Sequence, residues 1–159
     1  MRSSQLASAI LAPVFAAALL AGCGSSAGTA GGTGSQCGSG HHAEVVVELA
    51  SKKVVDGCAS FSAAEIPAET AMKRSGIEFA IQHFSFGDAI CQIDHEPTSY
   101  SKCFASGQPY WALFTWSGKG PWKAAQVGVS DIKLANGDAL GWHFGNGTPG
   151  APPKPPKVG

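Results

Sequence analysis

An odd number of cysteines, five in 159 residues, constrains this chain more than any other feature of its sequence. They are Cys23, Cys37, Cys58, Cys91 and Cys103. In an oxidising compartment cysteines pair as disulfides, so an odd one in an exported protein needs an explanation. If Cys23 serves a separate purpose, the other four can pair completely. We therefore expect a small domain that is held by two disulfides.

Residues 1–22 have the three parts of a secretory signal peptide in the expected order. Arg2 supplies the positive end, an apolar run extends from Leu6 to Leu20, and small residues follow. The run is shorter than the ~20 residues that a bilayer core requires, so a membrane-spanning helix is the weaker interpretation. We expect these residues to be removed from the mature protein.

The end of this signal, Leu20-Ala21-Gly22-Cys23, resembles the lipobox of bacterial lipoproteins at every position. The resemblance implies cleavage before Cys23, a diacylglyceryl group on its sulfur, and often a further fatty acid, such as palmitate, on its new amine. Two or three acyl chains anchor a protein stably, since each buried CH₂ contributes ~0.8 kcal/mol. The alternative, an ordinary cleavage site, would leave Cys23 as an unpaired thiol. Lipidation predicts a location on the extracytoplasmic face of the cell membrane, with the membrane itself as a partner.

Composition divides the mature chain into three parts. Residues 23–36 are rich in Gly and Ser and predict a flexible tether. Residues 148–159 contain five prolines and predict an extended, poorly ordered tail. Residues 37–147 lie between them, and a segment of about 110 residues is long enough for one domain with a single core. The chain has eleven basic and eleven acidic residues and no basic stripe, so we expect no nucleic-acid partner.

Alternating and β-branched residues predict a strand-rich domain. The expected strands are residues 44–49, 77–84, 89–94, 110–116 and 138–144, with a possible short return strand beginning at Trp122. Residues 77–84 and 89–94 form a hairpin around Gly87, and Asn136-Gly137 makes a turn before the last strand. A helix is expected over residues 62–75, with Pro67 in its first turn and Gly76 at its end. These elements indicate an α+β domain with one helix across a mostly antiparallel sheet.

The four remaining cysteines allow three disulfide connectivities. We favour Cys91 with Cys103, because they are close in sequence and closing such a loop contributes about 3 kcal/mol in the chain-entropy model. Cys37 with Cys58 then follows by elimination.

Several segments of the domain resemble a domain of unknown function in secreted bacterial proteins, related to the small C-terminal β domain of transcobalamin and intrinsic factor. They are Thr70-Ala71-Met72 with Gly76, Ala89-Ile90-Cys91-Gln92-Ile93-Asp94, Tyr110-Trp111, Gly120-Pro121-Trp122, and Asn136-Gly137-Asp138-Ala139-Leu140-Gly141-Trp142. The similarity covers about residues 44 to 145. It implies a β-grasp-like fold and, as in the cobalamin carriers, a role in covering one face of a corrinoid.

Two departures from this family bear on the ligand. The carriers have a large helical barrel that holds most of the vitamin, and this chain has none. Relatives usually have a Gly after Ile-x-x, where this chain has the polar turn Asp94-His95-Glu96.

Five large aromatic residues are candidates for a ligand or partner site. They are Tyr110, Trp111, Trp116, Trp122 and Trp142. Strand alternation places Tyr110 and Trp116 on one face and Trp111 on the other, so both faces are apolar. One interpretation is that a helix and a loop cover these residues as core. The other is an exposed aromatic surface for a planar ligand or a protein.

Metal binding and catalysis have less support in the sequence. The histidines, including His95 in Asp94-His95-Glu96, show none of the ligand spacings of known zinc sites, so no metal site is predicted. The cysteines are better used in disulfides than as nucleophiles. There is no nucleophile elbow and no phosphate loop, so we expect no enzyme and no resident cofactor.

These patterns together predict a membrane-anchored binding or docking module. Its expected partner is a corrinoid or a membrane transport or surface protein. A structural interaction lipoprotein without a small ligand is the alternative, and a metal-dependent enzyme is the least supported one.

Mass spectrometry of the membrane fraction tests the anchor. We expect the mature chain to begin at Cys23 and to carry diacylglyceryl and acyl masses on that residue. A free thiol or a disulfide at Cys23 would contradict both the location and the pairing of the other cysteines.

Overall fold

The structure of the protein, a computed structural model, describes residues 37–146 and 150–155. The expected signal peptide (1–22), the lipobox with Cys23, and the tether (23–36) lie outside the described residues, as does part of the tail.

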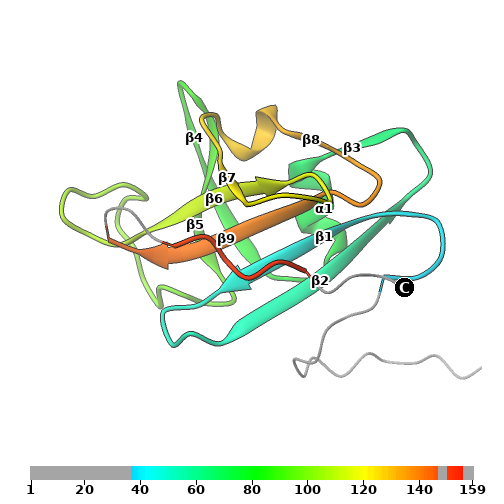
Figure 1. The fold of residues 1–159 in the computed structure, drawn as a ribbon. Coiled ribbons are helices and arrows are strands. Elements are labelled where there is room, and N and C mark those ends of the chain that lie inside the picture. The colour runs from blue at the N-terminus through cyan, green and yellow to red at the C-terminus, as the bar shows by residue number, and fades with distance from the viewer. Residues whose placement is uncertain (1–36, 147–149, 156–159) are drawn as a thin grey trace, which may run out of the picture. The chain divides into compact units, whose positions relative to one another are not determined.

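The centre of the fold is a five-stranded sheet with the order β2-β1-β9-β6-β7 (Figure 1). Its strands are β1 (His41–Glu48), β2 (Val54–Phe61), β6 (Tyr110–Trp116), β7 (Lys123–Ala124) and β9 (Ala139–Gly145). The neighbouring strands β1 and β9 run parallel, whereas all other neighbours in this sheet are antiparallel. The first and last strands of the domain therefore lie side by side in its middle.

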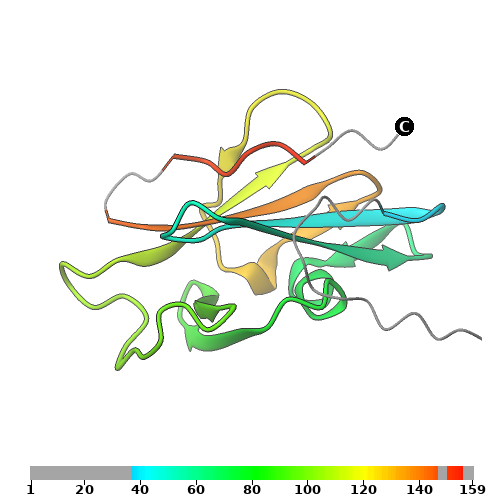
Figure 2. The same cartoon turned by 90° about the horizontal axis from the view of Figure 1, so that it is seen from below.

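The remaining elements lie on one face of this sheet (Figure 2). They are β3 (Glu65–Pro67), α1 (Ala68–Arg74), β4 (Phe79–Phe84), β5 (Gly87–Ile93), the 3₁₀ turn η1 (Val129–Asp131) and β8 (Lys133–Ala135). Two antiparallel pairs form among them, β3 with β8 and β4 with β5.

The main core lies between the sheet and α1. Val45 and Val47 of β1 are fully buried on this side, and Trp142 of β9 is only 2% exposed. The helix contributes Ala68, Ala71 and Met72, which are also fully buried. The indole Nε1 of Trp142 donates a hydrogen bond to the Met72 sulfur at 3.2 Å, so the largest core residue also has a polar partner.

The helix is shorter than the sequence predicts. It begins at Ala68, not at residue 62, and residues 65–67 instead form β3. Pro67 explains the difference, because a proline disfavours the helical conformation at the residue before it. The expected end is confirmed: Gly76 follows the helix with a φ of +76°, the left-handed conformation that glycine adopts most easily.

The strand β2 was not predicted from the sequence. Asp56 and Gly57 interrupt its apolar pattern, because Asp and Gly are residue types that are depleted in strands. The strand forms because β1 pairs with it over its full length. A Cβ on Gly57 would lie 2.4 Å from the carbonyl oxygen of Ser75, so the close approach of the helix end requires a glycine here.

Part of the expected disordered tail packs on the domain. Residues 150–155 cross the face of the sheet opposite α1 (Figure 2), and Pro152 is fully buried there. A Cβ on Gly141 would lie 2.4 Å from the Pro152 ring, so this glycine gives the tail room to approach β9. The expectation of a poorly ordered tail is therefore wrong for these six residues.

Both expected disulfides are present. Cys37 pairs with Cys58 and Cys91 pairs with Cys103, with Cα separations of 5.5 and 4.8 Å that are normal for disulfides. The fold class is likewise confirmed as a small, disulfide-linked α+β domain. Its strand order β2-β1-β9-β6 with a parallel central pair is the β-grasp arrangement.

Replacing Gly57 by Ala tests the close contact between β2 and the end of α1. We expect Gly57→Ala to lower the free energy of unfolding by roughly 1–3 kcal/mol, because the added methyl group must displace backbone atoms. Chemical denaturation measures this. Gly38→Ala is the matched control, since nothing lies within 4 Å of its added Cβ. Equal stabilities of the two variants would contradict this packing.

Candidate functional site

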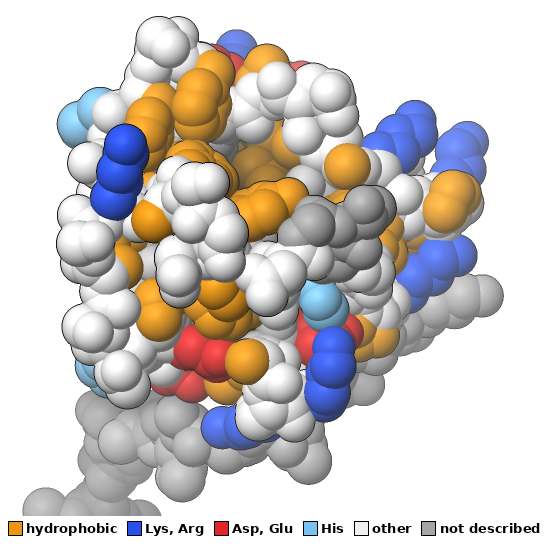
Figure 3. All heavy atoms as spheres, turned by 90° about the vertical axis from the view of Figure 1, so that its left-hand side faces the viewer, with side chains coloured by type: hydrophobic (Ala, Val, Ile, Leu, Met, Phe, Trp, Pro, Cys, Tyr) orange, Lys and Arg blue, Asp and Glu red, His pale blue; other side chains and the backbone are white. Residues whose placement is uncertain are grey.

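The candidate site is an open groove of about 540 Å³ at the edge of β6. Its walls are residues 88–90 of β5, residues 110–114 of β6, and residues 124–129. Seen from the side, hydrophobic side chains gather around a hollow on this part of the surface (Figure 3). A volume of this size is in the usual range for small-ligand sites.

The groove has a rigid floor and an exposed apolar rim. Trp111 and Trp142 line it from the core and are 4% and 2% exposed. Phe86, Phe104 and Val127 line its rim and are 48%, 38% and 47% exposed. Most large hydrophobic residues that the described chain leaves exposed therefore gather at this groove, a distribution that is typical of binding sites.

Aromatic contacts organise one side of the rim. Phe84 and Phe86 stack with their ring centroids 5.1 Å apart, and Phe104 contacts them at 5.5 and 5.9 Å. Tyr110 continues the row, with its ring 5.6 Å from that of Phe104. The disulfide between Cys91 and Cys103 holds the loop of Phe104 against β5, which explains how residues 20 positions apart form one cluster.

Two strand edges border the groove. On the side of β6 away from β9, β7 pairs only with Phe114 and Thr115, and the Leu113 carbonyl accepts a hydrogen bond from the Ala125 N–H at 2.9 Å. No described strand pairs with Trp111 or Ala112 on that side. Among the described strands, β5 pairs with β4 alone.

The groove carries little charge. Asp88 is the one charged residue among the described residues that line it. Its carboxylate is held by the ring of His83, and its backbone N–H donates a hydrogen bond to the Ser130 hydroxyl at 2.9 Å. The arrangement suits an uncharged, mainly apolar ligand with one polar contact at the rim.

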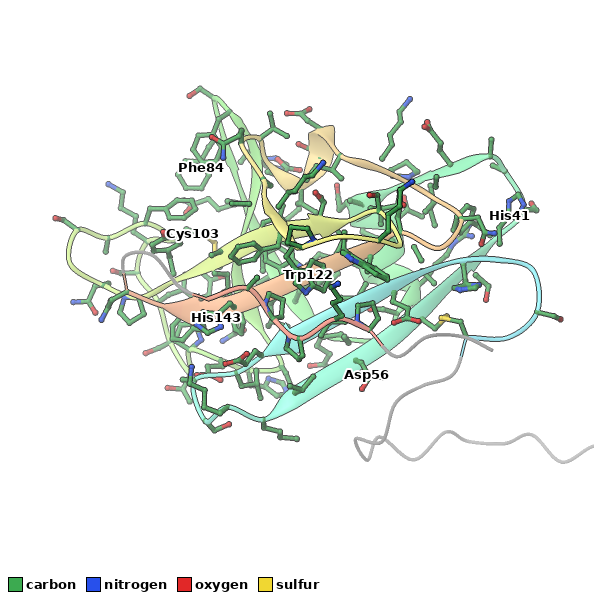
Figure 4. The ribbon with its side chains drawn as sticks, in the orientation of Figure 1. His41, Asp56, Phe84, Cys103, Trp122 and His143 are labelled. Atoms are coloured by element: carbon green, nitrogen blue, oxygen red, sulfur yellow. A yellow bond between two sulfur atoms is a disulfide. The ribbon has the colours of Figure 1, made fainter. Side chains whose placement is uncertain are left out.

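The structure does not bring the five predicted aromatic residues together. Tyr110, Trp111 and Trp142 line the groove, the two tryptophans as its floor. Trp116 and Trp122 contact each other at 6.3 Å on the opposite side of the sheet, where Trp122 packs near Gly141 and Lys154 lies 5.9 Å from the Trp116 ring. In Figure 4, Trp122 and His143 both lie on the face that carries the tail.

Three phenylalanines of this aromatic cluster were not predicted from the sequence: Phe86 and Phe104 at the rim, and Phe84, which packs against both. A signal for Phe84 and Phe86 existed, because Phe84-Ser85-Phe86-Gly87 places two aromatic residues at the tip of a predicted hairpin. Such a tip is exposed to solvent, where large apolar residues are unusual without a binding role.

A second cluster of polar side chains lies at the other end of the sheet. Potential ligand atoms of Cys37, His42 and Glu44 all lie within 4.8 Å of one another, although Cys37 is bonded to Cys58. Glu44 is 8% exposed, and burial raises its pKa, while His42 lowers it and Asp56 raises it. His42 Nδ1 lies 3.1 Å from the Gly40 carbonyl oxygen.

The turn Asp94-His95-Glu96 does not form a metal-type cluster. His95 lies 3.2 Å from Glu78 at the surface, whereas Glu96 accepts a hydrogen bond from the Ala50 N–H at 3.1 Å. The carbonyl of Glu96 also accepts a hydrogen bond from the Trp111 indole at 3.0 Å. Glu96 therefore links the turn between β1 and β2 to the floor of the groove.

No family model and no curated protein matches this chain. Solved structures do match its fold. One is a "putative metal binding protein" from Ruminococcus gnavus, with a TM-score of 0.51 and 14% sequence identity. The match covers 68% of this chain and 99% of the Ruminococcus gnavus chain. At this identity the likeness concerns the fold alone. Within the described residues, no helix is both long and apolar enough to cross a membrane.

The burial of Glu44 predicts a pH-dependent stability. Because its pKa is raised in the folded state, the folded protein binds more protons than the unfolded chain, and stability falls as the pH rises from the ordinary glutamate pKa through the raised one. We expect Glu44→Gln to be more stable than the wild type at pH 7, with no such difference at pH 3. Thermal unfolding across this range measures it. Glu65→Gln, an exposed residue, is the control and should leave the pH dependence unchanged.

Proposed function

We propose that this protein is a lipid-anchored, extracytoplasmic binding module whose ligand site is the groove beside β6. The observation that carries the proposal is the combination of a buried tryptophan floor with a rim of exposed aromatic residues. A fixed floor needs no ordering when a ligand binds, so the apolar surface that the ligand covers contributes directly to affinity.

The ligand proposed here is a planar molecule with an apolar ring face, and a corrinoid is its most specific form. The groove is open, so it would cover one face of such a ligand and leave the other to a second protein or to solvent. This agrees with the resemblance to the β domain of cobalamin carriers. The stacked rings of Phe84 and Phe86 lie beside Phe104, and such aromatic groups contribute about 0.5–1.5 kcal/mol per pair.

The membrane is the second partner in this proposal. The support is the lipobox at Cys23 and the Gly- and Ser-rich residues that follow it. A flexible tether would keep the groove accessible above the bilayer.

An extended segment of a membrane transport or surface protein is the second candidate ligand. The specific observation is the edge of β6 at Trp111 and Ala112, beside which no described strand lies. An added peptide strand forms main-chain hydrogen bonds with such an edge, and pockets next to it select side chains. Catalysis is not part of the proposal, and neither is a metal in the groove, because its lining supplies a single carboxylate, Asp88.

Tryptophan fluorescence tests the corrinoid form of the proposal. The mature chain carrying Cys23→Ser is titrated with cobalamin, and Trp111 and Trp142 at the floor should be quenched at tens of micromolar ligand. Replacing both Phe86 and Phe104 by Ser should weaken binding about tenfold, since the lost contacts are worth roughly 1.4 kcal/mol together.

Tyr100→Ser is the matched control for these variants. Tyr100 and Phe104 are similarly exposed, at 40% and 38%, but Tyr100 lies outside the groove. If Tyr100→Ser weakens binding as much as the groove variants do, the assignment of the ligand site to the groove is wrong. If no quenching occurs, direct corrinoid binding is wrong, and binding of a partner protein that Phe86→Ser and Phe104→Ser abolish would then support the second candidate.

A further inference from the structure

We propose that Cys37, Cys58, His42 and Glu44 form a binding site for a zinc-type divalent cation, which the Cys37–Cys58 disulfide closes and its reduction opens. The site is independent of the groove, because it lies on β1 and β2, and β9 separates β1 from β6 in the sheet.

Three of the four proposed ligands already lie at close to the spacing of a tetrahedral metal site. Metal–ligand bonds of 2.0–2.3 Å place tetrahedral ligand atoms about 3.3–3.8 Å apart. The ligand atoms of Cys37, His42 and Glu44 already lie within 4.8 Å of one another. Side-chain rotations alone can therefore close the remaining difference.

The sheet holds three of the four ligands in place. His42 and Glu44 are two positions apart on β1, so their side chains point to the same face. Cys58 lies directly opposite Glu44 on β2. Cys37 precedes β1 and lies with its Cα 5.5 Å from that of Cys58. A site on paired strands needs little ordering before the cation binds.

The charges and hydrogen bonds also favour a cation. Glu44 is 8% exposed, so a positive ion beside its carboxylate would offset buried negative charge. The Nδ1 atom of His42 lies 3.1 Å from the Gly40 carbonyl, to which it can donate a hydrogen bond. That bond leaves the Nε2 lone pair for the metal, the usual arrangement for a histidine ligand.

The disulfide acts as the gate. In the oxidised protein the two sulfurs are bonded to each other and lack the negative charge of thiolate ligands. A dithiol reductant is oxidised to its own disulfide and transfers two electrons and two protons, which yields the thiols of Cys37 and Cys58. The divalent ion then displaces both thiol protons and binds the two thiolates.

The Cys37–Cys58 disulfide is the more accessible of the two. Cys37 is 6% exposed, but its partner Cys58 is half-buried, whereas Cys91 and Cys103 are 5% and 8% exposed, so Cys58 is the sulfur that a reductant can reach. Reduction requires a thiolate to reach a disulfide sulfur, so Cys37–Cys58 should be reduced first. The groove would then keep the disulfide that positions Phe104 while the cation site opens.

Cobalt(II) is a suitable probe, because thiolate ligation gives it a charge-transfer absorption band. The mature chain carrying Cys23→Ser is titrated with Co²⁺ before and after reduction with a dithiol. We expect one Co²⁺ per chain with the thiolate band after reduction, none in the oxidised protein, and displacement by Zn²⁺. Reoxidation should release the metal.

Two neighbouring histidines give a matched pair of variants. His42→Ala should weaken Co²⁺ binding at least tenfold, whereas His41→Ala should not, because His41 lies outside the cluster, with Nδ1 2.8 Å from the Ala63 carbonyl oxygen. Glu44→Gln should also weaken it. Equal affinities of the two histidine variants, or equal binding by the oxidised protein, would overturn the proposal.

Alkylation of the reduced wild-type cysteines tests the ligands without any variant. With Zn²⁺ present, Cys37 and Cys58 should react with iodoacetamide at least tenfold more slowly than without it, as mass spectrometry of the peptides measures. Protection of Cys91 and Cys103 instead would overturn the assignment. Neither outcome depends on ligand binding in the groove.

Discussion

The parallel pairing of β1 with β9 is the interaction on which the rest of the structure depends. Val45, Val46 and Val47 are at most 2% exposed, so β1 is buried on both faces in the manner of a strand within a parallel pair. Parallel neighbours cannot be joined by a tight turn, and the chain between them must cross over the sheet. That crossing places α1 on one face and lets the tail cover the other (Figure 2). The groove beside β6 lies at a place where this covering is incomplete.

Local patterns predicted much of this fold, because most elements are built from local signals. The hairpin around Gly87, the strand at residues 110–116 and both disulfides are confirmed. The missed strand β2 is stabilised by a partner strand and not by its own composition, and its Gly57 serves the helix end rather than the strand. The burial of Pro152 has the same character, since a proline-rich tail contains no sign that Gly141 leaves room for it. In each case the deciding contact is with a residue far away in the sequence.

The candidate site was predictable only in part, for a related reason. Alternation along β6 correctly placed Trp111 and Trp116 on opposite faces, and Trp111 is in the core. It could not say which aromatic residues stay exposed, because exposure depends on which segments cover each face. The rim came instead from Phe86 and Phe104, and their contact depends on the Cys91–Cys103 disulfide. The Cys91–Cys103 pairing was expected from the sequence. The position that it gives to Phe104 could not be predicted, because it depends on the path of the loop between the two cysteines.

The two disulfides therefore have different roles in one small domain. Cys91–Cys103 is buried and positions the aromatic rim, so its loss would alter the shape of the groove. In Cys37–Cys58, Cys58 is half-buried and Cys37 lies beside His42 and Glu44. Reduction of this disulfide would therefore place thiols next to these two polar side chains. Because β1 and β2 pair over eight positions, we expect the sheet to keep its register without this disulfide. Reduction of Cys37–Cys58 would therefore leave the strand pairing intact, so this disulfide can respond to the redox state of its surroundings. Reduction of Cys91–Cys103 would change the shape of the proposed ligand site.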